Sequence, residues 1–222
     1  MARTLANLQT ELNQRVDDDI DTDNSQNWIN AAWQEVLDYY PWPFLVNSVT
    51  GTLGGSTSSQ TFSSVFSISN FGRLAQFMNN QVVFSRIDWQ DKDRPGQYEV
   101  IAISPDNTSF ITPGSETGTG YLKYIKTISD LMTATDTLTS IASAGETGVP
   151  AGWVKQFEEA VVAGAAERYF QQALKPNMAQ YWASKRDFYL DSIIDQMTRL
   201  SESDAPAFRP VQYNETTVVG EF

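Results

Sequence analysis

Large apolar side chains recur at helical spacing near the start of the chain. Leu5, Leu8, Leu12 and Val16 follow one another at steps of three and four, which predicts a helix over residues 3–17. A second stripe predicts another helix, with Asn24 or Ser25 as its N-cap and an end near Tyr40, because Pro41 and Pro43 cannot continue it. Its members are Trp28, Ile29, Ala32, Trp33, Val36, Leu37 and Tyr40.

The end of the chain carries the same helical periodicity. A helix rich in small residues begins near Trp153, and one side of it is predicted to hold Phe157, Ala160, Val161, Gly164, Ala165, Arg168 and Tyr169. Pro176 fits the first turn of a last helix, which presents Met178, Trp182, Tyr189, Ile193, Met197 and Leu200. Since neither end can bury its apolar stripe alone, we expect the two ends to pack together.

The middle of the chain alternates between apolar and polar residues and is broken by turn signals. Candidate strands span 46–52, 61–68, 74–78, 81–88, 98–104, 109–111 and 120–126. The segment 114–120 is mostly Gly, Thr and Ser, which predicts a loop tip, and 127–152 reads as a connector of low hydrophobicity. Short strands with this punctuation favour a small antiparallel sandwich or barrel.

These patterns together predict an α+β fold. Residues 1–43 and 148–200 form a helical bundle, 44–147 form an inserted antiparallel β-domain with its connector, and 201–222 form an extended C-terminal tail. Trp42 and Phe44 are expected to wedge the two parts together. The residues expected to pack the bundle are Trp28, Trp33, Leu37, Phe157, Val161, Gly164 and Trp182.

Composition removes several kinds of chemistry. The chain has no histidine and no cysteine, so serine–histidine catalysis, cysteine–histidine catalysis and thiolate metal sites are excluded. Catalysis by a pair of carboxylates or by lysine is not excluded. Glu158 and Glu159 are poor candidates for such a pair, because adjacent residues point about 100° apart on a helix. We therefore expect no enzyme activity and no cofactor. No apolar run is long enough to suggest a membrane span, and no signal peptide is recognisable.

The chain is strongly acidic, with a formal net charge of −12. Residues 1–42 hold eight acidic and two basic residues, which gives −6, half of the total. A protein that grips DNA needs clustered Lys and Arg, and none is visible. The acids at 17–23 resemble a calcium loop begun at Asp19, but Asn24 and Asn30 stand where an EF-hand needs Gly and Glu, so a solvated loop is favoured.

Two other features invite a binding function. Trp89, Tyr98 and Phe110 in the strand region are the candidates for stacking on sugar rings, which is the alternative reading of this chain as a glycan-binding module. The tail carries apolar side chains that are unusual in disordered acidic tails, and we favour a docking segment over permanent disorder. These side chains are Phe208, Val211, Tyr213, Val218, Val219 and Phe222.

Both ends of the chain also resemble a known family. The stretch from Leu12 to Arg15, then Trp28 to Val36, is similar to the opening helices of tailed-bacteriophage head-to-tail adaptor proteins. Trp42-Pro43-Phe44-Leu45 followed by strands resembles the adaptors that carry an inserted β-domain. The closing stretch 149–166 and the aromatic residues at 181–189 resemble the small-residue helix and long last helix of that family.

This resemblance implies a structural virion protein. It implies a homo-oligomeric ring, commonly of twelve copies, that is made in the host cytoplasm and joins the portal protein to a tail tube or nozzle protein. The C-terminal tail would reach the portal, and double-stranded DNA would pass through the ring without specific binding. The nearest alternative within the same setting is a tail-completion or stopper ring protein, which would bind an adaptor in place of the portal.

Overall fold

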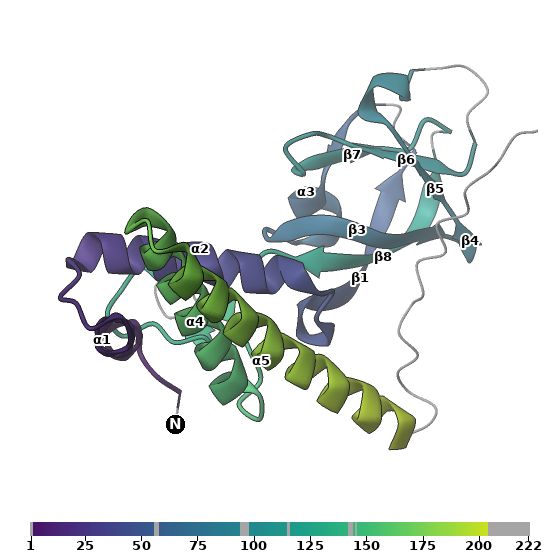
Figure 1. Cartoon of the computed structure of the whole chain (residues 1–222). Coiled ribbons are helices and arrows are strands. Elements are labelled where there is room, and N and C mark those ends of the chain that lie inside the picture. The colour runs from purple at the N-terminus through teal and green to yellow at the C-terminus, as the bar shows by residue number, and fades with distance from the viewer. Residues whose placement is uncertain are drawn as a thin grey trace, which may run out of the picture.

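The computed structural model describes residues 2–55, 58–93, 98–114, 116–141, 144 and 146–203, of which 200–203 by backbone only. Helices from both chain ends lie together at one end of the molecule, and the strands form a separate β-module at the other (Figure 1). The helix α2 (Thr22–Tyr39) runs from the helical end toward the β-module (Figure 1). The predicted α+β fold with antiparallel strand pairs is confirmed.

The two N-terminal helices bury the predicted stripes. α1 (Leu5–Val16) is capped by Thr4, whose hydroxyl accepts from the backbone N–H of Asn7. α2 (Thr22–Tyr39) begins earlier than predicted, because Asp21 is its N-cap in place of Asn24 or Ser25. The Asp21 carboxylate accepts from the backbone N–H of Asn24 at 2.9 Å, and a negative charge suits the N-terminus of a helix.

The middle of the helix α4 (Val154–Gln172) is buried on every side. Every residue from 160 to 166 is buried, so the buried surface is wider than the predicted side, whose last members Arg168 and Tyr169 are only half-buried. Small side chains allow neighbours to approach the helix closely from all directions, and α1, α2 and α5 (Pro176–Ser203) all contact it. The predicted start of α5 at Pro176 is confirmed.

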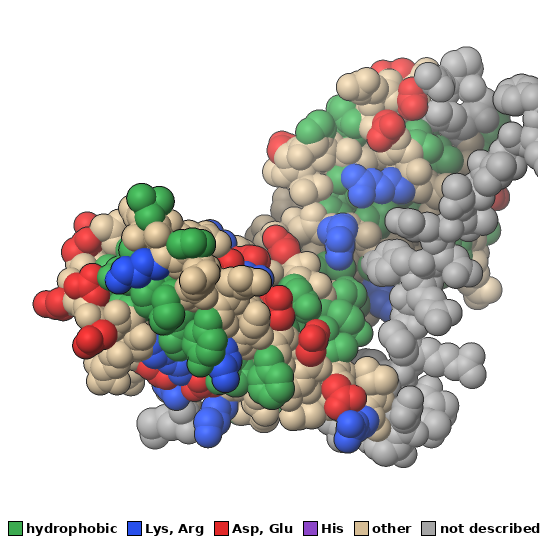
Figure 2. All heavy atoms as spheres, in the orientation of Figure 1, with side chains coloured by type: hydrophobic (Ala, Val, Ile, Leu, Met, Phe, Trp, Pro, Cys, Tyr) green, Lys and Arg blue, Asp and Glu red, His purple; other side chains and the backbone are tan. Residues whose placement is uncertain are grey.

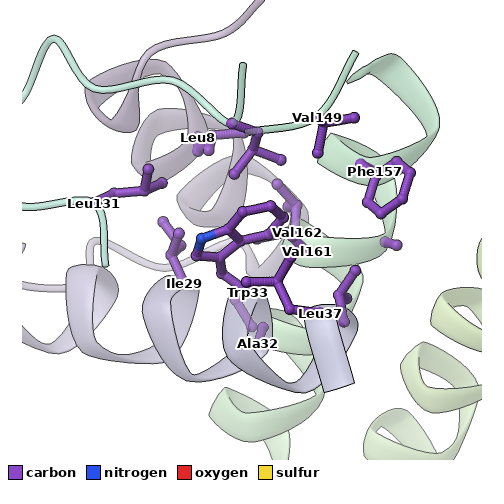
Figure 3. Packing of buried hydrophobic residues seen from close by; sticks show 14 of the residues in the cluster. Leu8, Ile29, Ala32, Trp33, Leu37, Leu131, Val149, Phe157, Val161 and Val162 are labelled. Carbon is purple, nitrogen blue, oxygen red and sulfur yellow. The ribbon is translucent and has the colours of Figure 1, made fainter. Parts of the chain in front are cut away.

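Trp33 lies at the centre of the helical core, fully buried between α2 and α4 (Figure 3). Side chains from α1, α2, α4 and the connector surround it, among them Leu8, Ile29, Leu131, Val149 and Val161 (Figure 3). Gly164 is where α4 meets α2, since a Cβ placed there would lie 3.0 Å from Cβ of Ala32.

The connector after the β-module packs against α2. Asn30 holds it with two hydrogen bonds: its amide donates to the carbonyl of Leu131 at 3.0 Å and its side-chain oxygen accepts from the Leu131 N–H at 2.9 Å. Short strands β9 (Ser140–Ile141) and β10 (Glu146–Thr147) lie in this connector. We had grouped it with the β-domain, whereas its buried side chains Ile128, Leu131, Leu138 and Ile141 lie in the helical core.

Two four-stranded sheets make up the β-module. The first has the order β1 (Val46–Gly54), β8 (Thr117–Lys126), β3 (Phe71–Asn79), β4 (Val82–Val83). The second has the order β2 (Gln60–Thr61), β7 (Ser109–Ile111), β6 (Val100–Ile103), β5 (Ser85–Ile87). Of the pairs described, β5 with β6 is parallel and the others are antiparallel. Two short 3-10 helices, η1 (Pro43–Leu45) and η2 (Trp89–Asp91), precede β1 and follow β5.

Aromatic side chains fill the space between these sheets. Phe62 stacks on Phe71 with ring centroids 3.9 Å apart, and Phe66 and Phe77 lie in the same cluster. Residues 61–68 were predicted as a strand, but Phe62–Phe66 form the short helix α3, which Thr61 caps. The predicted loop tip at 114–120 was also wrong in its second half, because β8 begins at Thr117 and pairs with β1.

Trp42 joins the helical core to the β-module. Its ring is fully buried, packs edge-on against Phe157 of α4 at 4.8 Å, and stacks on Phe44 at 6.4 Å. The indole N–H donates to the carbonyl of Val36 at 2.7 Å. The short helix η1 and then β1 follow directly after Trp42.

Two glycines of β1 provide a matched test of packing in the β-module. A Cβ at Gly51 would lie 2.3 Å from the carbonyl oxygen of Val65 in α3, whereas a Cβ at Gly54 would meet nothing within 4 Å. We expect Gly51→Ala to lower the free energy of unfolding by about 1–3 kcal/mol through overpacking, and Gly54→Ala to leave it nearly unchanged. Urea unfolding of both variants measures the difference, and equal stabilities would contradict the packing of α3 on β1.

Candidate assembly surfaces

Most of the predicted packing residues lie inside the protein. Trp33, Leu37, Phe157 and Val161 are buried in the helical core, and Gly164 touches Ala32. These residues therefore hold the bundle together and are not open to another protein.

The other two predicted packing residues lie near the surface. Trp28 is half-buried and meets Tyr169 edge-on at 5.9 Å. Trp182 of α5 is half-buried under the guanidinium of Arg15, which lies 5.7 Å from its ring centroid. The buried indole nitrogen of Trp182 has no hydrogen-bond partner within the described part of the chain. Both tryptophans thus pack at the edge of the helical bundle.

The predicted partner-binding residues of the tail, Phe208 to Phe222, lie outside the described residues. The backbone is described as far as the end of α5 at Ser203.

An ion cluster that the sequence did not reveal joins α1 to α4. Arg3 contacts Glu11 at 2.7 Å and Glu159 at 3.0 Å, and its backbone N–H donates to the Glu158 carboxylate at 2.6 Å. Arg15 binds both Glu11 and Glu159. Residues about 150 positions apart in sequence thus meet, and spacing alone gives no signal for such a contact.

The two adjacent glutamates of this cluster have opposite pKa shifts. Burial raises the pKa of Glu158, whose side chain is only 3% exposed, and this outweighs the hydrogen bond and charge from Arg3. Burial also acts to raise the pKa of Glu159, but hydrogen bonds from Arg15 and Arg3, together with their charges, lower it overall. The folded protein therefore favours the charged form of Glu159 and disfavours the charged form of Glu158.

A second ion network ties α5 to the rest of the bundle. Arg186 of α5 contacts Glu35 of α2 and Glu167 of α4, both at 2.8 Å, and Arg168 also reaches Glu35 at 2.9 Å. Three helices are thereby joined through charged hydrogen bonds, which are stronger than neutral ones.

The acidic loop at 17–23 has structural roles in this fold. Asp17 ends α1 at a φ of 55°, Asp18 accepts from the Tyr169 hydroxyl at 2.6 Å, and Asp21 caps α2. Among the described residues there is no cluster of His, Cys, Asp and Glu that could hold a metal ion. The described helices also include none that is long and apolar enough to span a membrane.

The three candidates for sugar stacking do not form one platform. Phe110 is fully buried in the β-module core, so its proposed role in stacking was wrong. Trp89 is half-buried with the ammonium of Lys92 over its ring at 5.4 Å, and Tyr98 is 75% exposed. Phe110 lies in β7, whereas Tyr98 precedes the start of β6 at Val100.

Apolar side chains are exposed on α5 and in the turn before it. Met178, Tyr181 and Phe188 of α5 and Leu174 of the turn are all exposed. Figure 2 shows apolar side chains gathered along the visible face of α5, with basic side chains next to them. The predicted apolar row of this helix began with Met178, which is 42% exposed, whereas Ile193 and Met197 of the same row are buried.

The glutamate pair predicts a difference between two neighbouring substitutions. A depressed folded pKa means that the charge of Glu159 stabilises the fold above its ordinary pKa, and this stability is lost as the pH falls through the folded value. We expect Glu159→Gln to lower the free energy of unfolding at pH 7 by about 1–3 kcal/mol and to flatten its fall at acidic pH.

Glu158→Gln serves as the control for this prediction. Its amide oxygen still accepts from the Arg3 N–H, and a buried charge is removed, so stability at neutral pH should be unchanged or higher. Thermal unfolding as a function of pH measures both variants. A loss of stability for Glu158→Gln as large as that for Glu159→Gln would contradict the assignment.

Comparison with known proteins places this molecule in a family. No curated protein matches the chain. A family model described as "SU10 adaptor protein" matches residues 3–211, which include both the helical bundle and the β-module. The chain therefore belongs to the SU10 adaptor protein family and is a structural adaptor protein of a bacteriophage virion, where it contacts other head or tail components.

Proposed function

We propose that this protein forms the head-to-tail adaptor ring that joins the portal protein to the tail and continues the DNA channel. The observation that carries the proposal is the family match, which runs through both chain ends and the β-module as one unit. A ring of twelve copies is the assembly that we expect, with the helical domain (1–43 and 148–200) as its wall. The inserted β-module (46–126) would project outward or toward a tail tube or nozzle protein.

The construction of the bundle suits a ring wall. α4 is enclosed by helices from both chain ends, and the Arg3–Arg15 and Arg186 networks tie those helices to it. A wall subunit must keep its shape while neighbours and DNA press on it, and close packing gives protein interiors low compressibility. These features support a mechanical role.

The charge of the protein suits a channel for DNA. With a net charge of −12, a lumen lined by this protein would repel phosphates and would not hold them. We expect double-stranded DNA to pass without specific binding. The acids of the 17–23 loop are candidates for the lumen, apart from Asp18 and Asp21, which are occupied within the fold.

The C-terminal tail (201–222) is the proposed portal-binding segment. Phe208 and Val211 lie within the family match, which ends at residue 211, whereas Tyr213, Val218, Val219 and Phe222 lie beyond it. An extended segment with alternate apolar side chains binds by filling pockets or by adding a strand to a partner's sheet. The residues beyond the match would then be specific to this protein's own portal.

Removal of the tail tests this function. We expect deletion of residues 201–222 to abolish co-sedimentation with the portal protein of the same virus, because the apolar anchors are lost. Tyr213→Asp and Phe222→Asp should each weaken binding without changing the length of the chain. Tyr98→Asp, at an exposed site of the β-module, is the matched control and should leave binding unchanged.

Two results would decide against the proposal. The full chain could stay a monodisperse monomer by light scattering even with the portal present, which is incompatible with an adaptor ring. It could also bind an isolated adaptor ring and not the portal, which would identify it as a tail-completion or stopper protein. DNA retardation at physiological salt would contradict the proposed role of the acidic surface.

A further inference from the structure

The first strand of the β-module has an open edge. β1 lies at one end of the first sheet, and within the described part of the chain it pairs with β8 alone, along its whole length. In an antiparallel pair, every second residue directs its N–H and C=O away from the partner strand. Between Asn47 and Leu53, the groups that point away from β8 have no hydrogen-bond partner among the described residues. Such an edge can accept a further strand.

Nothing in β1 protects this edge. Proteins usually protect an exposed edge strand with charged residues, with proline or with a bulge. β1 contains no charged residue and no proline, and its register with β8 has no shift, in contrast to that of β3 with β8. The helix α3 covers the core side of β1 at Gly51, whereas Thr50 and Thr52 on the outer side are exposed.

The sheet that ends at β1 is basic, although the whole chain has a net charge of −12. Its four strands hold Arg73, Lys123 and Lys126 and no Asp or Glu. Lys123 lies between two core residues of β8 and therefore on the outer face, directly opposite Ser48 of β1. A strand added to β1 would lie two strand spacings from Lys123, about 10 Å, which is comparable with the Debye length in dilute salt. An acidic segment would therefore fit this edge.

The C-terminal tail contains a segment of matching character. Residues 204–222 hold three acidic residues and one basic residue, which gives a net charge of −2. Pro206 and Pro210 cannot donate to a sheet, so an uninterrupted strand is possible only after them. The four residues 216–219 are all Thr or Val, which favour strands. The uncharged run 216–220 has a glutamate on either side.

The last helix carries the tail toward this edge. Arg186 of α5 contacts Glu35 of α2 at 2.8 Å. Five residues further along α5, Asp191 accepts from the hydroxyl of Tyr39, which is the last residue of α2. α5 therefore runs in the same direction as α2, toward the turn that leads into β1, and its last turns extend beyond the other helices (Figure 1). Ser203 lies about 18 Å beyond Asp191 at 1.5 Å per residue.

The tail is long enough to reach β1. Sixteen residues separate Ser203 from Val219, and they span up to about 53 Å when extended. Because η1 shortens the chain after α2, Val46 lies within about 20 Å of Tyr39. The path from Ser203 back along α5, across to α2 and on to Val46 is then at most about 50 Å, and a direct path is shorter.

We propose that residues 216–220 of the chain's own tail pair with the edge of β1 as an added strand. The tether gives the tail a local concentration of about millimolar. A second copy has no such advantage, and its net charge of −12 repels the first copy. The pairing itself does not rest on the proposed ring. Its consequence does, since β1 and the portal would compete for the same tail.

Paired cysteines test the added strand, because the chain has no cysteine of its own. Thr50→Cys is combined with a cysteine at each position from 216 to 220 in turn, and the full chain is oxidised at low concentration. Side chains of a strand alternate between its two faces, so we expect an intramolecular disulfide at positions of one parity only. Tyr98→Cys, at an exposed site of the β-module, is the matched control and should form none with the same tail cysteines.

Hydrogen exchange measures the same pairing without cysteines. Deletion of residues 204–222 should remove protection from the β1 amides that point away from β8, while the amides of β8 stay unchanged. Val218→Pro combined with Val219→Pro should do the same, because one of the two N–H groups faces β1 in either strand direction. Gln212→Pro, in the segment that links α5 to the added strand, is the control and should leave the protection of β1 intact.

Three outcomes would overturn the proposal. One is a disulfide-linked dimer in place of the intramolecular bond, which would assign the edge to a second copy. Another is equal crosslinking at both parities or to Tyr98→Cys, which would indicate random collisions of a tethered tail. The third is hydrogen exchange in β1 that deletion of the tail does not change. None of them bears on portal binding, and a tail that fails to bind the portal would leave the pairing intact.

Discussion

The enclosure of α4 is the constraint on which the rest of this structure depends. A helix that is buried on all sides needs neighbours on all sides, and this chain supplies them from both of its ends. Gly164 allows α2 to come close at Ala32, and Trp33 lies buried among side chains of α1, α2 and α4 (Figure 3). The β-module can then be inserted between α2 and α4 without disturbing the core, because its own aromatic cluster is separate.

Polar side chains determine how the helices are oriented around α4, which the burial of apolar side chains does not specify. Burial alone is non-directional, so it does not decide how α1, α2 and α5 are rotated about α4. The Arg3–Arg15 cluster orients α1, Arg186 orients α5, and the two hydrogen bonds of Asn30 hold the connector on α2. Among the described residues, the same orientation of α5 leaves Met178, Tyr181 and Phe188 exposed.

Local patterns in the sequence predicted the helices but not what each helix contacts. The spacing of Leu5, Leu8 and Leu12 was sufficient for α1, and Pro176 located the start of α5. The short helix α3 was missed because its aromatic residues also suit strands, although Phe62 and Phe66 are four apart and Thr61 can cap. The ion cluster of Arg3 and Arg15 could not be predicted, since its members meet only after α1 has folded onto α4. The role of the apolar residues of the C-terminal tail in portal binding stays a prediction.

The packing of Trp42 affects how force passes between the β-module and the helical core. Its indole is hydrogen-bonded to the last turns of α2, pressed against Phe157 of α4, and followed almost at once by the first strand. The chain returns to the helical core at Ile125 and Ile128, which belong to the same buried cluster as Trp42. Val46 pairs with Ile125, so the outgoing and returning segments lie side by side. Two paired connections restrict bending between the two parts more than a single linker would, so a force on the β-module should be transmitted to the helical core.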